Sequence, residues 1–151
     1  MSRSPRRLWR ISNYADLSGL GGLRFAGRWH NRGRPVVYCA DHPAAALAEM
    51  LVHLDREDMP ATFQMLTLEV ATDVPIERVD VRRLSANWTK TLAETRDLGD
   101  EWLKSLRTPL LEVPSALVPD AWNVLLNPAH PKAGEVKILQ SQHVPLDSRF
   151  G

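Results

Sequence analysis

Hydrophobic positions along the chain form short runs typical of strands and two longer stretches with helical spacing. Runs rich in β-branched and aromatic residues predict strands, because such side chains pack well on a pleated, half-buried surface. The strands expected on this basis cover residues 8–11, 36–39, 63–70, 74–81, 110–113, 122–126 and 136–141. Because the strands are short and the helices are few and grouped, the pattern favours an α+β fold with a mixed or antiparallel sheet.

Two segments have the spacing of amphipathic helices. The first runs from about His42 to Leu54, where apolar residues recur at positions i, i+1, i+4, i+5 and i+8. Asp41 is expected to cap its N-terminus, with Pro43 in the first turn, where the missing N–H costs little. The second helical region covers about residues 89–106, and we expect Gly99 to break it in two.

Length and composition fit a single globular domain. The chain has 151 residues, of which 44% are hydrophobic and 25% charged, the balance of an ordinary soluble protein. No apolar stretch approaches the roughly 20 residues of a membrane-spanning helix, and no signal-peptide pattern begins the sequence. The single cysteine, Cys39, excludes an intramolecular disulfide. We therefore expect a cytoplasmic protein that does not bind membranes.

Positive charge is concentrated near the N-terminus. Residues 1–34 contain eight arginines and one acid, Asp16, while the rest of the chain is acidic overall. This cluster has three interpretations: a solvated basic terminus, a nucleic-acid contact, or a pocket for a phosphorylated small molecule. Residues 1–7 fit the first and are expected to form a flexible extension ahead of a domain spanning 8–151. Arg10 and Arg28 lie in patterned sequence and fit a pocket better, since the guanidinium fork binds phosphate bidentately.

Several familiar site patterns are missing from the sequence. None of the five histidines belongs to an H-E-x-x-H motif, and we expect no metal site. The glycines of segment 19–22 lack the G-x-G-x-x-G spacing, because position 24 is Arg24, and there is no P-loop motif. A Rossmann domain or P-loop ATPase is therefore not expected.

Candidate nucleophiles and polar loop residues have structural explanations as well as functional ones. Cys39 lies in an apolar strand and is expected to be a buried, inert thiol. Ser115 follows a strand, and by itself is typical of a turn or capping serine. Asn127 and His130 flank prolines in a stiff loop that either caps a turn or forms a wall that positions a ligand.

Three residues in the first half stay ambiguous between packing and chemistry. Glu49 lies in a helix rich in alanine and leucine, and is either a surface glutamate or a carboxylate beside an apolar pocket. A carboxylate in such a pocket can act as a base or stabilise a developing cation. Tyr38 and Trp29 are either core residues or pocket walls that stack on a flat heterocycle.

Six short motifs, taken together and in order, resemble the RES-domain family, which is named for its Arg, Glu and Ser. The motifs are Leu8–Ile11, Gly27–His30, Val37–Ala40, the helix with Glu49, Val113–Ala116 and Asn127–Pro131. They span about residues 8–150, whereas segment 72–108 cannot be matched to the family. Family members are bacterial toxins, each paired with an antitoxin that resembles an Xre-type helix-turn-helix repressor.

The resemblance implies a fold similar to ADP-ribosyltransferases and the cleavage of NAD⁺ at its nicotinamide–ribose bond. It implies that the catalytic residues are Glu49, Arg28, Tyr38 and Ser115, and that NAD⁺ is bound by Arg10, Arg28, Trp29, Tyr38, Asn127 and His130. Arginines suit the pyrophosphate, and a carboxylate stabilises the oxocarbenium-like ribose. The glycines of segment 19–27 are expected to let the backbone approach the ligand. No metal or resident cofactor is expected.

The acceptor of the ADP-ribosyl group stays open at this stage. Water would make the protein a glycohydrolase, inorganic phosphate as co-substrate a phosphorylase, and a protein or nucleic acid an ADP-ribosyltransferase. The expected partner is an Xre-type antitoxin that covers the pocket, with a homodimer within the complex as a further expectation and no direct contact with nucleic acid. The rival interpretations are a non-enzymatic nucleic-acid-binding module, whose binding would depend strongly on salt, and a purely structural partner.

Overall fold

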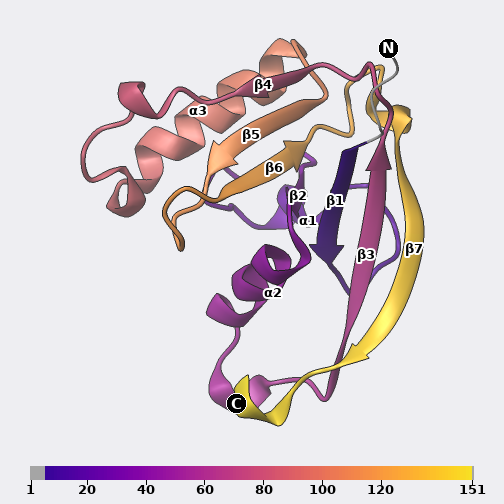
Figure 1. Ribbon diagram of the computed structural model, residues 1–151. Coiled ribbons are helices and arrows are strands. Elements are labelled where there is room, and N and C mark those ends of the chain that lie inside the picture. The colour runs from indigo at the N-terminus through magenta and orange to yellow at the C-terminus, as the bar shows by residue number, and fades with distance from the viewer. Residues whose placement is uncertain (1–5, 151) are drawn as a thin grey trace.

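Seven strands form one sheet in the computed structural model, which describes residues 6–150 (Figure 1). They are β1 (Arg6–Ile11), β2 (Val37–Ala40), β3 (Thr62–Val70), β4 (Ile76–Arg78), β5 (Leu110–Pro114), β6 (Trp122–Leu126) and β7 (Val136–Pro145). The order across the sheet is β4-β5-β6-β2-β1-β3-β7. Only β4 and β5 run parallel; the other neighbours are antiparallel. The expected α+β class with a mixed sheet is confirmed.

The first strand begins earlier than the sequence pattern predicts. β1 starts at Arg6, and both Arg6 and Arg7 lie in register with β3 residues. Arg6 also donates a hydrogen bond of 2.5 Å to the buried carboxylate of Glu112. Strand pairing and an ion pair thus hold Arg6 in the sheet, two residues before the expected boundary at residue 8. Residues 1–5 of the expected extension lie outside the described residues.

Three α-helices and five short 3₁₀ turns complete the part of the chain that the structure describes. They are α1 (Gly21–Arg24), α2 (Pro43–Val52), α3 (Leu92–Ser105), η1 (Arg56–Asp58), η2 (Val81–Arg83), η3 (Trp88–Lys90), η4 (Ala133–Glu135) and η5 (Ser148–Phe150). Within residues 6–150, no helix combines the length and apolar character needed to cross a bilayer.

Both predicted helices form, but two details of their ends differ from expectation. The N-cap of α2 is His42 and not Asp41: His42 has an extended backbone, and its Nδ1 accepts the Ala44 N–H at 3.1 Å. α3 is continuous through Gly99. A Cβ at Gly99 would lie 1.5 Å from the carbonyl oxygen of Trp29. This glycine therefore marks a close contact between helix and loop, not a helix end.

The sheet buries a hydrophobic cluster on each face. Leu111 and Leu125 pack with Trp29 and Trp102, whereas the flanking residues of the same strands belong to a separate cluster around Leu8. Because successive side chains of a strand point to opposite faces, the two clusters lie on opposite sides. α3 covers the first face beside β5, and α2 lies near β2 (Figure 1).

Candidate active site

A cavity of about 700 Å³ opens where β1 and β2 separate. The two strands pair at one position, Trp9 with Ala40, and residues of both strands line the cavity. The Arg10 Nη1 donates a 2.9 Å hydrogen bond to the carbonyl of Tyr38. A continued antiparallel ladder would have given that carbonyl a backbone N–H as its donor. The diverging strands thus create the cavity, and Arg10 satisfies the carbonyl left inside it.

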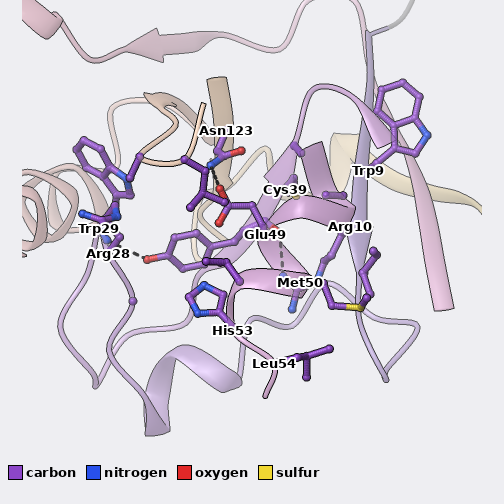
Figure 2. Close-up of a pocket in the computed structure, with 18 of the residues that line it drawn as sticks. Trp9, Arg10, Arg28, Trp29, Cys39, Glu49, Met50, His53, Leu54 and Asn123 are labelled. Carbon is purple, nitrogen blue, oxygen red and sulfur yellow. Dashed lines mark hydrogen bonds between the residues drawn. The ribbon is translucent and has the colours of Figure 1, made fainter. Parts of the chain in front are cut away.

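The carboxylate of Glu49 lies at this cavity and is held by Asn123 (Figure 2). The Asn123 Nδ2 donates to the Glu49 Oε1 at 2.9 Å, and among the side chains that the structure describes it is the only donor to this carboxylate. α2 comes close to the sheet because its buried contact is the small residue Ala46, which packs on Ala40. Because Ala40 is the direct cross-strand partner of Asn123, helix and sheet bring acid and amide together.

Tyr38 contributes its ring to the cavity, while its hydroxyl is used inside the protein. The Tyr38 Oη accepts the Trp29 N–H at 3.2 Å and lies 2.6 Å from the His30 Nδ1. The Gly27 N–H also donates to this nitrogen, so the Nδ1 is an acceptor and the Tyr38 hydroxyl donates to it. Burial raises the pKa of Tyr38 and lowers the pKa of His30, which keeps both groups neutral.

Two guanidinium groups join Arg10 around the cavity. Arg28 lines it and donates from Nη1 to the Thr89 carbonyl at 2.9 Å. Arg96 of α3 also lines it and donates from Nε to the Gly27 carbonyl at 2.8 Å. In the view of Figure 2, Arg28 and Arg10 lie on opposite sides of Glu49. Among the residues that the structure describes, the cavity lining therefore carries three positive charges and one negative charge.

Trp29 borders the cavity, but its side chain belongs to the core. It is 2% exposed, packs in the cluster with Trp102, and lies 5.9 Å from Trp88 between ring centroids. Of the two interpretations the sequence allowed, the packing role fits this geometry. Its backbone N–H matters more to the site, since it donates to the Tyr38 hydroxyl.

Ser115 does not line the cavity. Its Oγ accepts the N–H groups of Leu117 and Val118 at 3.1 and 3.2 Å, which makes it the capping residue of the turn after β5. The residues that follow it, Ala116 and Leu117, do line the cavity. The serine thus shapes the cavity wall through the turn, and its expected catalytic role gains no support from this position.

Asn127 and His130 also lie away from the cavity lining. The buried Asn127 side chain donates to the Leu103 carbonyl and accepts the Ala129 N–H, each at 3.1 Å. The His130 Nδ1 accepts the Lys132 N–H at 3.0 Å. Asn127 follows Asn123 by four residues on an extended chain, roughly 13 Å further along. Both expected NAD⁺-binding residues therefore stabilise the loop at the far end of β6.

Gly19 and Gly27 of segment 19–27 lie against other parts of the protein. Gly19 has a φ of +68°, and a Cβ there would lie 2.7 Å from the Val36 nitrogen. A Cβ at Gly27 would lie 2.4 Å from the Tyr38 Oη. At Gly19 the space is taken by the protein. Gly27 lines the cavity, so the approach of its backbone to a ligand stays a prediction. Cys39 is buried as expected, and burial raises its pKa to about 12.

Two polar residues of the site were missed by the sequence analysis, Asn123 and Arg96. Asn123 lies four residues before Asn127, at the start of the polar loop that the sequence analysis considered. Its pairing with Ala40 could not be known without the sheet order. Arg96 lies in segment 72–108, which carries no recognisable motif. The arginine-rich N-terminus is not a single surface patch, because Arg6, Arg10 and Arg28 each bond to groups within the protein.

Comparisons with known proteins match this chain to one family over nearly its whole length. The model of the RES domain matches residues 7–148. The protein named Toxin Res from Pseudomonas putida KT2440 is 47% identical over 145 residues, which cover 95% of this chain and 98% of the relative. The Prs ADP-ribosylating toxin of Sphingobium sp. YBL2 is 37% identical over 152 residues, covering 94% of both chains.

Among solved structures, a chain of the M. tuberculosis MbcT–MbcA toxin–antitoxin complex shares the fold. The TM-score is 0.71 at 17% sequence identity, and the match covers 94% of this chain and 85% of that one. The sequence matches and the shared fold agree with the motifs from which the resemblance was first drawn. The chain is therefore a member of the RES-domain family of toxins.

Proposed function

We propose that this protein binds NAD⁺ in the cavity between β1 and β2 and cleaves the bond between nicotinamide and ribose. The observation that carries the proposal is the Glu49 carboxylate, held by Asn123 in a cavity whose other charged groups are Arg10, Arg28 and Arg96. A cavity with excess positive charge suits an anionic pyrophosphate. A single carboxylate inside it suits a reaction in which positive charge develops on the substrate.

The chemistry follows from where the charge moves. When the C–N bond breaks, its electron pair goes to the cationic nicotinamide ring, which leaves as a neutral molecule. The ribose then acquires oxocarbenium character, as in glycoside hydrolysis. Glu49 stabilises this charge electrostatically, and the hydrogen bond from Asn123 fixes the carboxylate beforehand, so that little reorganisation is needed during the reaction. The exposed face of the Tyr38 ring offers a surface for a flat group of the substrate.

The acceptor completes the reaction. Attack by water on the ribose gives ADP-ribose and releases a proton, and attack by phosphate gives an ADP-ribose phosphate ester. Degradation of NAD⁺ by one of these routes is the function we favour. ADP-ribosylation of a macromolecule is the second candidate, favoured by the Sphingobium relative, which is 37% identical and named an ADP-ribosylating toxin.

We also propose that an antitoxin of the Xre type covers the mouth of the cavity. A chain of a toxin–antitoxin complex shares the fold of this protein. Val52, Leu92 and Leu117 line the cavity and are 54%, 39% and 40% exposed, so apolar surface is available where a partner would dock. A homodimer within the complex and a cytoplasmic location stay predictions from the sequence.

Nicotinamide release tests the proposal directly. The purified protein, freed of any antitoxin, is mixed with NAD⁺ with and without inorganic phosphate, and nicotinamide is quantified by chromatography. Release in plain buffer identifies a glycohydrolase, and release that needs phosphate identifies a phosphorylase. No release by folded protein in either condition would overturn degradation. Transfer of labelled ADP-ribose to proteins or nucleic acids in a cell extract would then identify a transferase.

A further inference from the structure

One face of α3 holds the tight turn of residues 27–30, which carries Arg28. The Arg96 Nε donates to the Gly27 carbonyl at 2.8 Å, and the Thr95 Oγ1 donates to the Arg28 carbonyl at 2.5 Å. The next carbonyl, that of Trp29, lies directly against Gly99. Three consecutive carbonyls of the turn are thus fixed by three residues of one helix.

Arg96 differs from the other two residues because it also lines the cavity. Its Nε is engaged with Gly27, and within residues 6–150 no acceptor bonds to its two terminal nitrogens. The side chain is half-buried, so its position is fixed while the end of the guanidinium stays accessible. A planar fork held at one edge, with two free N–H groups at the other, has the geometry that binds phosphate bidentately.

The other two arginines of the cavity are more committed to the protein. One terminal nitrogen of Arg10 is bonded to the Tyr38 carbonyl, and one terminal nitrogen of Arg28 to the Thr89 carbonyl. Arg96 of α3 lies beside the turn that carries Arg28, because its Nε donates to the carbonyl of Gly27, the residue before Arg28. The arrangement therefore presents two cations at one end of the cavity, which suits a group with two negative charges.

We propose that Arg96 binds the pyrophosphate of the dinucleotide substrate, together with Arg28, so that α3 supplies a substrate-binding residue as well as the clamp on the turn. This inference rests on the proposed function and adds to it the residue that recognises the anionic part of NAD⁺. The structural alternative is that Arg96 only holds the turn through Gly27.

Binding measurements on a Glu49→Gln background separate these roles without turnover. The ligands are ADP-ribose, which carries the pyrophosphate, and nicotinamide riboside, which has no phosphate, and affinity is measured by calorimetry. Arg96→Met should weaken ADP-ribose binding by about 10- to 100-fold, the usual effect of losing a hydrogen bond to a charged group. It should leave nicotinamide riboside binding unchanged, and the affinity for ADP-ribose should depend less on salt.

Two further variants serve as controls. Lys104→Gln removes a positive charge from the exposed side of α3, outside the cavity, and should leave both affinities unchanged. Thr95→Val removes the other side-chain bond to the turn without touching the cavity charge. If Arg96→Met weakens both ligands equally, as Thr95→Val would, or weakens neither, the role assigned to Arg96 is overturned. If Glu49→Gln protein with Arg96 intact binds neither ligand, the proposed function fails as well.

Discussion

Substitution of Gly99 by alanine tests the contact between α3 and the Arg28 turn. Alanine inside a helix is normally stabilising over glycine, by roughly 0.5–1 kcal/mol. Here the added Cβ would lie 1.5 Å from the Trp29 carbonyl oxygen, where real Cβ contacts essentially never fall under 3.0 Å. Helix and turn must therefore separate by about 1.5 Å, since neither the carbonyl nor the helix backbone can rotate away.

The structure predicts that this cost exceeds the gain in helix propensity. Overpacking against side chains typically costs about 1–3 kcal/mol, and backbone atoms yield less than side chains do. The separation would also stretch the bonds from Thr95 and Arg96 to the turn. We expect Gly99→Ala to lower the free energy of unfolding by about 2 kcal/mol or more, and the melting temperature by about 4–8 °C.

Thermal unfolding followed by circular dichroism measures the effect, with Gly21→Ala as the matched control. Gly21 also lies in a helix, but a Cβ there meets nothing within 4 Å. The control should leave stability unchanged or raise it by up to about 1 kcal/mol, the ordinary gain of alanine over glycine in a helix. A melting temperature for Gly99→Ala at or above that of the wild type would refute the close packing of α3 on the turn.

Two other substitutions give predictions with a definite sign. Asn123→Asp removes the amide that donates to Glu49 and puts a second negative charge beside it, so the carboxylate is repelled from its position. Nicotinamide release at neutral pH should therefore fall, and release at the wild-type rate would count against the contact. Burial alone raises the pKa of Glu112, but hydrogen bonds from Arg6 and Arg78 outweigh it and hold the pKa below the usual 4.5. This stabilisation is present above the unfolded pKa and lost as pH falls through the folded one. Glu112→Gln should therefore lower the free energy of unfolding by about 1–3 kcal/mol at neutral pH, measured by denaturant unfolding. The free energy of unfolding should then fall less steeply as the pH is lowered, and a fall as steep as that of the wild type would contradict the prediction.

The helices and strands of this fold could be predicted from the sequence because hydrophobic side chains recur along each of them with the spacing of a helix or a strand. The alternation in segment 63–70 and the apolar spacing around Ala46 match β3 and α2, since burial on one face imposes these periods. The ends of helices and strands depend on single contacts, which leave no repeating pattern in the sequence. His42 rather than Asp41 caps α2 because its Nδ1 accepts the Ala44 N–H. Gly99 stays inside α3 because it faces the Trp29 carbonyl.

The residues of the candidate site also fall into those that local sequence predicts and those that it does not. Glu49, Arg10 and Arg28 were found because they lie in motifs, and the structure brings them to one cavity. Asn123 depends on which strands are neighbours, and Arg96 on where a helix of unmatched sequence docks; neither is a property of local sequence. Motif membership also placed Ser115, Asn127 and His130 in the site, whereas their hydrogen bonds hold turns outside the cavity lining.

Nicotinamide release by wild-type and Glu49→Gln protein tests the central claim most directly. The glutamine keeps the shape of the side chain and an oxygen that can accept the Asn123 bond, so the fold should be unchanged. It removes the negative charge that stabilises the ribose cation. We predict that release from NAD⁺ falls by at least about 100-fold, with the melting temperature and the affinity for ADP-ribose retained. Release at the wild-type rate by well-folded Glu49→Gln protein would contradict the role of Glu49.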